Sequence, residues 1–161
     1  MASAERDARA RRPGSSGLVP VRRGPSRWGR AYDPVMSVVA SVLVGLAALL
    51  HVYIFWMESV AWARPEVWKR FSVADQAAAD VTRPMAYNQG FYNLFLAVGA
   101  ALGLVLWWTG RETAGTTLVL FSTGSMVAAA TVLAASGRRY RRAALTQGTL
   151  PLLGLLAMLL A

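Results

Sequence analysis

Four long apolar runs restrict the fold of this chain more than any other feature. More than half of its 161 residues are hydrophobic, and they are concentrated in these runs rather than spread in short periodic patches. A helix needs about 20 apolar residues to cross the hydrocarbon core of a bilayer. We therefore predict an all-α membrane protein, an antiparallel bundle of four transmembrane helices. The predicted spans are residues 35–57, 89–109, 113–135 and 143–161.

The composition excludes several kinds of site. The chain has no cysteine, which excludes disulfides, thiolate metal ligands and cysteine nucleophiles. Its single histidine, His51, excludes a multi-histidine zinc site and paired axial haem ligands. No cofactor-binding motif is present either. We therefore predict neither a cofactor nor a bound metal.

Residues 1–34 form a basic tail that carries eight arginines and three acidic residues. Such a segment has too little apolar surface to offset the entropy of ordering, so we expect it to be disordered. A second interpretation is that translation starts at Met36 and that the tail is not made. The net charge of +9 lies mainly in this tail and in the loop Arg138–Arg142. We assign these arginines to anionic headgroups of the lipid bilayer and predict no nucleic-acid partner.

The segment 59–89 is the one long connection between predicted spans. Pro65 is typical of a helix start and predicts a short helix to about Phe71. Ser72, with an acid three residues later, resembles a capping box and predicts a second short helix. Pro84 would end that helix before the second span begins. We expect a folded, partly helical lid on the membrane surface.

Tryptophan and tyrosine rings are typical of the headgroup region of a membrane. Tyr53, Trp56 and Trp62 lie at the end of the first run, and Trp68 lies in the long connection. We expect these rings to contact headgroups.

Small residues predict where helices approach closely. Ser41 and Gly45 are four residues apart in the first span and predict a groove for another helix. Gly99 and Gly103 form a GxxxG pair in the second span. That pair could serve a homodimer.

Basic residues near the ends of spans favour the cytoplasmic side. The long connection and the loop Arg138–Arg142 share one side, with eight basic residues. The other side has five basic residues when only the part of the tail next to the membrane is counted. It has nine basic residues with the whole tail, and one if translation starts at Met36. We predict a bacterial plasma-membrane protein with both loops in the cytoplasm and both termini outside.

His51 and Glu58 close the first span and lie seven residues apart. Seven residues are close to two helical turns, so both side chains point to one side, about 10 Å apart along the axis. That distance is too long for a bond between them. Each therefore needs a partner from elsewhere in the chain.

The ends of odd spans and the starts of even spans meet at one membrane face, so polar residues there can share a pocket. Polar groups below a membrane surface are costly unless they pair or line a wet cavity. We expect a deeper tier formed by His51, Asn93 and Gln147. We expect a rim tier formed by Glu58, Asn88 and Gln89. The predicted ligand-binding residues are His51, Glu58, Asn88, Gln89, Tyr92, Asn93 and Gln147.

Three sequence blocks suggest a family. They read His51-x-Tyr-Ile-x-x-x-Glu58, then Asn88-Gln-Gly-x-Tyr-Asn-x-Phe-Leu-Ala97, then Gln147-Gly148 with a proline soon after. From about Met36 to the end, the chain resembles the small bacterial integral-membrane family called domain of unknown function 1304. The resemblance implies four spans and an intracellular long loop, but no reaction. Where that pattern has an acid just before the histidine, this chain has Leu50, which argues against a mechanism needing a carboxylate there.

Three functions remain open from the sequence. The first is binding, or help in transporting, a small amphipathic or polar molecule. The second is a membrane-embedded isomerase in which His51 or Glu58 moves a proton while Asn88, Gln89 and Asn93 hold the substrate. The third is a structural subunit whose polar layer only fastens helices. Because no second proton carrier lies close to His51, we favour a non-enzymatic role.

Overall fold

The structure is a computed structural model that describes residues 33–161, and these form helices and connecting loops without a strand. The long helices are α1 Pro34–Phe55, α3 Gln76–Trp108, α4 Glu112–Ala135 and α5 Arg141–Leu160. The short elements are the π-helical turn η1 Trp56–Val60, α2 Pro65–Trp68, and the 3-10 turns η2 Lys69–Phe71 and η3 Arg138–Tyr140. Predictions about residues 1–32 of the tail lie outside the described residues.

Within residues 33–161, four helices are long and apolar enough to cross a membrane, and the predicted all-α four-helix membrane fold is confirmed. The spanning segments are Pro34–Val60, Gln76–Trp108, Glu112–Ala135 and Arg138–Leu160. The first begins where sequence chemistry favours it, because the Asp33 side chain accepts from the Val35 amide at 2.9 Å and caps the helix.

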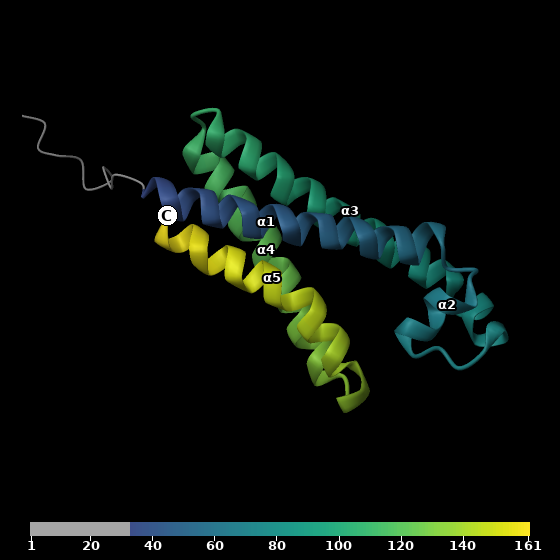
Figure 1. The fold of residues 1–161 in the computed structure, drawn as a ribbon. Coiled ribbons are helices and arrows are strands. Elements are labelled where there is room, and N and C mark those ends of the chain that lie inside the picture. Colours follow the sequence, from purple (N-terminus) through teal and green to yellow (C-terminus); the bar gives the residue numbers. More distant parts are fainter. Residues whose placement is uncertain (1–32) are drawn as a thin grey trace, which may run out of the picture. The chain divides into compact units, whose positions relative to one another are not determined.

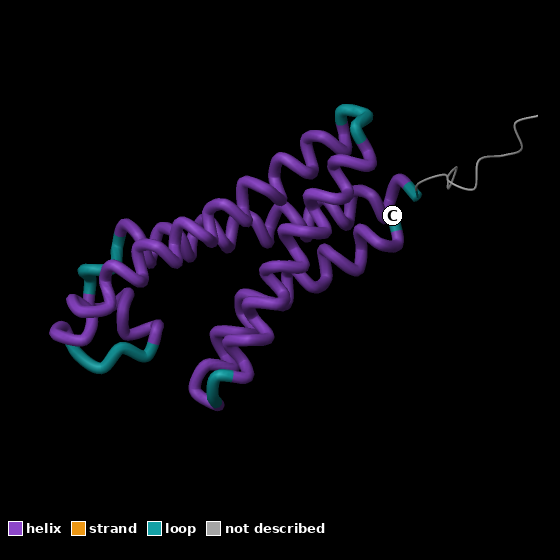
Figure 2. The backbone as a smooth tube through the Cα atoms, turned by 180° about the vertical axis from the view of Figure 1, so that it is seen from behind, coloured by secondary structure: helices purple, strands orange, loops and turns teal. Residues whose placement is uncertain are grey.

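Each long helix packs against two neighbours within this part of the chain. α1 packs on α3 and α5, and α4 packs on the same two helices from the other side. The short turns between α3, α4 and α5 make these neighbours antiparallel. The carboxyl end of the chain therefore returns beside the start of α1 (Figures 1 and 2).

Glycines bring α3 and α4 into close contact. A Cβ atom on Gly103 would lie 2.8 Å from the Val119 amide nitrogen, and one on Gly115 would lie 2.7 Å from the Gly103 carbonyl oxygen. A Cβ atom on Gly99 would meet the Ser122 hydroxyl. The Gly99–Gly103 face is thus covered by α4 of the same chain, and the predicted homodimer, which stays a prediction, would need another surface.

The groove predicted at Ser41 and Gly45 is only half correct. Ser41 meets α3, because Trp108 Nε1 donates to its hydroxyl at 2.9 Å. Gly45 has no atom within 4 Å of where its Cβ would lie, so no neighbouring helix uses it for a close approach.

The predicted boundary between lid and second span is wrong. α3 is one helix of 33 residues, about 50 Å long, which exceeds the thickness of a bilayer core. Its cap is Asp75, whose side chain accepts from the Ala78 amide at 2.8 Å. Ser72, the predicted cap, instead ends η2 in the left-handed region with φ 60°.

Pro84 lies inside α3 and does not end it. Proline removes the amide that would donate to the carbonyl four residues earlier, at Asp80. Both residues are exposed, so water can satisfy that carbonyl. The interruption is tolerated because this part of the helix lies at the lid, before the apolar part of the span.

The lid is folded, as predicted, and its core holds the tryptophans. Trp62 and Trp68 are 6% and 4% exposed, and Trp62 Nε1 donates to the Ala79 carbonyl at 2.9 Å. Their predicted contact with headgroups is therefore wrong, because they fill the space between the lid and the start of α3. Tyr53 and Trp56 remain partly exposed, with their rings stacked at 5.9 Å.

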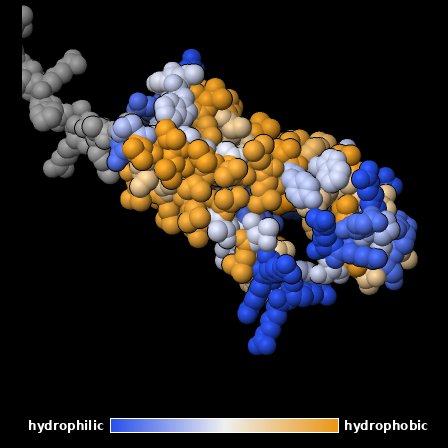
Figure 3. All heavy atoms as spheres, viewed as in Figure 1, coloured by the Kyte–Doolittle hydropathy of each residue, from blue (hydrophilic) through white to orange (hydrophobic). Residues whose placement is uncertain are grey.

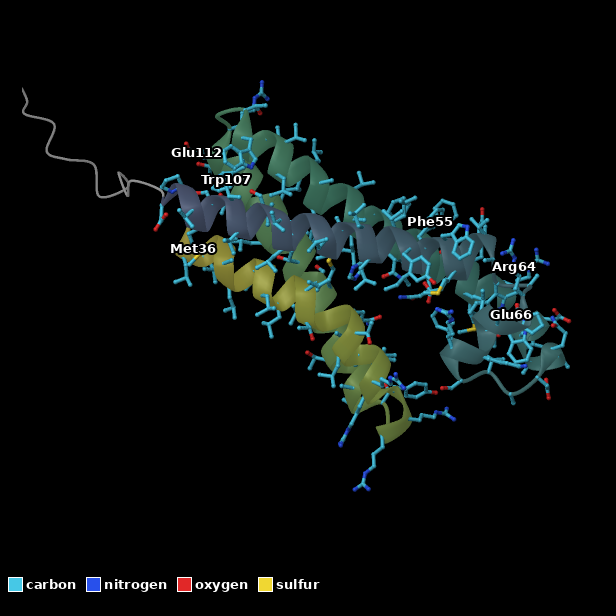
Figure 4. All side chains as sticks on the ribbon, viewed as in Figure 1. Met36, Phe55, Arg64, Glu66, Trp107 and Glu112 are labelled. Atoms are coloured by element: carbon cyan, nitrogen blue, oxygen red, sulfur yellow. The ribbon has the colours of Figure 1, made fainter. Side chains whose placement is uncertain are left out.

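The two ends of the bundle differ in chemistry (Figure 4). Phe55, Arg64 and Glu66 lie at the lid end, whereas Met36 and Trp107 lie at the other. The end away from the lid is closed by a continuous apolar core. That core consists of Ala40, Val44, Ala47, Ala48, Ala97, Ala100, Trp107, Val119, Met126, Ala157 and Met158.

Candidate functional site: a cleft beside the lid

A cleft opens at the end of the bundle that carries the lid. There the α1–α3 pair and the α4–α5 pair diverge (Figures 1 and 2). The space between them has a volume of about 970 Å³ and is lined by side chains from both pairs. Figure 3 shows the hollow with hydrophilic side chains on either side and the hydrophobic surface of the bundle above it. The cleft is therefore open at one end and sealed by the apolar core at the other.

The structure brings six of the seven predicted site residues to this cleft, and Asn88 is the exception. Asn88 is exposed and does not line the cleft. At about 100° per residue it points roughly 140° away from Asn93 around α3. The six lining residues are His51, Glu58, Gln89, Tyr92, Asn93 and Gln147.

Glu58 and Asn93 form the central polar contact. Asn93 Nδ2 donates to Glu58 Oε2 at 2.9 Å and to the Gln89 carbonyl at 3.2 Å. Since the Gln89 carbonyl can only accept, the amide orientation is defined, and within residues 33–161 no donor reaches Oδ1, which can still accept a hydrogen bond. Glu58 is only 8% exposed. The predicted two tiers are thus wrong, because Asn93 pairs with Glu58 rather than with His51.

A π-helical turn and a glycine make this contact possible. Glu58 lies in η1, where the helix widens at the end of α1. A Cβ atom on Gly90 of α3 would overlap the Ser59 hydroxyl and lie 3.1 Å from Glu58 Cβ. The Ser59 hydroxyl donates to the Tyr87 carbonyl at 2.9 Å, which ties the same turn to α3. The glycine of the Asn-Gln-Gly block therefore lets α3 approach Glu58.

His51 is 2% exposed and keeps one ring nitrogen for the cleft. Nδ1 lies 2.9 Å from the Ala47 carbonyl, which can only accept, so Nδ1 carries the proton. The other ring nitrogen, Nε2, forms no hydrogen bond within residues 33–161. Every fully buried side-chain nitrogen or oxygen in that range has a partner, so Nε2 is not fully buried. Nε2 is consequently reached from the cleft. As the spacing predicted, His51 and Glu58 each have their own partner.

Several further residues line the cleft that were not among the predicted ligand-binding residues. Three of them are arginines, one from the lid and two from the α4–α5 side. Their positions beside the cleft follow from how η2, η3 and the start of α5 fold. The further polar lining residues are Tyr53, Arg70, Ser72, Ser136, Arg139, Tyr140, Arg142 and Thr146. Residues 33–161 contain no group of three or more histidine, aspartate or glutamate side chains that could hold a metal ion.

Comparison with known proteins identifies a family. No curated protein and no solved structure matches the chain. A family model described as "Protein of unknown function (DUF1304)" matches residues 45–159, which is most of the chain and includes every predicted site residue from His51 to Gln147. The match confirms the resemblance found in the three sequence blocks. This chain belongs to the DUF1304 family.

Proposed function

We propose that the protein binds a small amphipathic molecule in the cleft, and holds it or helps to move it at one membrane face. The observation that carries this proposal is the cleft of about 970 Å³, which joins buried polar groups to an apolar wall. This volume suits a small-molecule site. Ionisable groups at membrane depth are costly, so a role in ligand contact accounts for their presence.

The polar atoms that face the cleft define the ligand's chemistry. Asn93 Oδ1 and the second Glu58 oxygen can accept hydrogen bonds, and so can Nε2 of a neutral His51. These three groups favour a ligand that brings hydrogen-bond donors, such as hydroxyl groups. The neighbouring apolar side chains suit a hydrocarbon part. Those side chains include Leu50, Ile54, Met57, Leu96, Val132 and Leu133.

A purely structural role is the main rival. A hydrogen bond between helices in a membrane contributes about 0.6–2 kcal/mol, so the Glu58–Asn93 contact alone could serve only to fasten α1 to α3. His51 does not fit that explanation. Its one hydrogen bond is to Ala47 of its own helix, so it joins no two helices.

A second candidate function is proton transfer within a bound molecule, as in an isomerase. It is favoured by one observation: His51 and Glu58 line the same cleft on the same helix, about 10 Å apart along its axis. A substrate lying between them could lose a proton to one group and gain a proton from the other. Gln89 and Asn93 would hold the substrate, and Asn88 would not contribute because it lies outside the cleft.

We further propose that the protein lies in a bacterial plasma membrane with the lid and η3 in the cytoplasm. This agrees with the eight basic residues on that side. The cleft would then open toward the inner leaflet.

The test is a mass-spectrometric search for lipids or metabolites that co-purify with the full chain in mild detergent. We expect a bound molecule in the wild type and its loss from His51→Ala and Asn93→Ala. Ser41→Ala is the matched control, because it removes the hydrogen bond from Trp108 between the same two helices, outside the cleft. If all three variants lose thermal stability and none changes what is bound, the structural role is correct and binding is not.

A further inference from the structure

The cleft carries an excess of positive charge. Arg70, Arg139 and Arg142 line it, and Glu58 is the one acidic residue among its lining side chains in the described part of the chain. Arg70 belongs to η2 of the lid, whereas Arg139 and Arg142 belong to η3 and the start of α5. The positive groups thus stand on opposite sides of the opening, where Figure 3 shows hydrophilic side chains on both sides of the hollow.

Tyrosines hold two of these arginines in place. Arg70 Nη1 donates to the Tyr53 hydroxyl at 3.2 Å. Arg139 donates to the Tyr140 hydroxyl, and its guanidinium lies 4.5 Å from the centre of that ring. These contacts orient the guanidinium groups without neutralising them.

The three arginines have no anionic partner in the protein. Across residues 33–161, none of them forms an ion pair with a carboxylate. Arginine presents a planar set of donors that matches a phosphate or carboxylate, often with two parallel hydrogen bonds. An anion between the two sides would satisfy donors from both and would offset the repulsion between them.

We infer that the cleft takes an anionic amphiphile whose phosphate or carboxylate group is bound between Arg70 and the pair Arg139 and Arg142. This inference rests on the proposed function and names the class of ligand. The apolar wall of the cleft argues for a hydrocarbon chain on the ligand rather than a free anion. The sign of the charge argues against a cationic amphiphile as the main ligand.

General attraction of basic loops to anionic lipid is the rival explanation. Arg138 distinguishes this explanation from binding in the cleft. It belongs to η3 like Arg139 and is exposed, but it does not line the cleft. If only surface charge matters, Arg138→Gln and Arg139→Gln must have equal effects. If the cleft binds the anion, they must differ.

The experiment titrates dodecyl phosphate into the full chain in dodecyl maltoside and counts bound molecules by native mass spectrometry. We expect one dodecyl phosphate per chain to bind well below the concentration at which inorganic phosphate or dodecylammonium binds. Arg70→Gln and Arg139→Gln should each weaken this binding on the order of tenfold, as loss of a hydrogen bond to a charged group would. Arg138→Gln should leave it unchanged.

Two results would overturn the inference. One is equal weakening by Arg138→Gln and Arg139→Gln, and the other is equal binding of inorganic phosphate. The proposed function fails separately, if no amphiphile of either charge shows binding that depends on His51 or Asn93. Should dodecylammonium, which carries N–H donors, bind in a way that depends on Asn93 and not on the arginines, the proposed function stands and the anionic ligand is wrong.

Discussion

Asn93 and Glu58 are 35 residues apart in the chain, and the Asn93 amide donates to the Glu58 carboxylate at 2.9 Å. This bond joins α3 to α1 beside the cleft. A second bond of equal length, from Trp108 Nε1 to the Ser41 hydroxyl, joins the same two helices away from it. Comparing variants that remove each bond can therefore separate an effect on stability from an effect on ligand binding.

Asn93→Leu should lower the free energy of unfolding by about 1–3 kcal/mol, because it leaves a buried carboxylate without its donor. Ser41→Ala should lower it by about 0.6–2 kcal/mol. Reversible unfolding in mixed detergent measures both. If Ser41→Ala lowers stability and Asn93→Leu does not, the Glu58–Asn93 contact is not a stabilising bond.

Gly90→Ala should destabilise the protein by about 1–3 kcal/mol, because the added methyl group would push α3 away from Glu58 and the Phe55 carbonyl. Gly45→Ala is the matched control. No atom lies within 4 Å of its added methyl group, so this change should be neutral or slightly stabilising. Thermal unfolding in detergent compares the two. Equal midpoints would mean that α3 does not approach η1 as closely as the structure has it.

Pro84→Ala should stabilise the protein by about 1–3 kcal/mol, since the new amide can donate to the Asp80 carbonyl within the continuous helix α3. Circular dichroism should show no loss of helix, and chemical denaturation measures the gain. A loss of stability instead would indicate that the chain turns at Pro84, as the sequence had suggested.

The proposed orientation can be tested by cysteine labelling, because the natural chain has no cysteine that would react. Ala63 in the lid and Glu112, the first residue of α4 at the opposite end, are both exposed. With the lid in the cytoplasm, Ala63→Cys should react with a membrane-impermeant maleimide only after the cells are permeabilised. Glu112→Cys should react in intact cells. The reverse pattern would invert the orientation, without changing the fold.

Local properties of the sequence were sufficient for the membrane fold. A span requires only a contiguous apolar run of sufficient length, and each run produced a helix. The depth of polar residues follows from their distance to the end of a run, which is why His51, Glu58, Gln89, Asn93 and Gln147 were found as candidates. The three sequence blocks were also enough to find the family.

Tertiary structure decided which of these residues meet. The π-helical turn rotates and widens the end of α1, and Gly90 lets α3 come close enough for Asn93 to reach Glu58. Neither effect is visible in hydropathy or spacing, because both depend on a neighbouring helix. The arginines of the cleft come from turns distant in sequence, which only the diverging helix pairs place around one opening. The length of a span is a property of one segment, whereas the cleft depends on how the helices pack against one another.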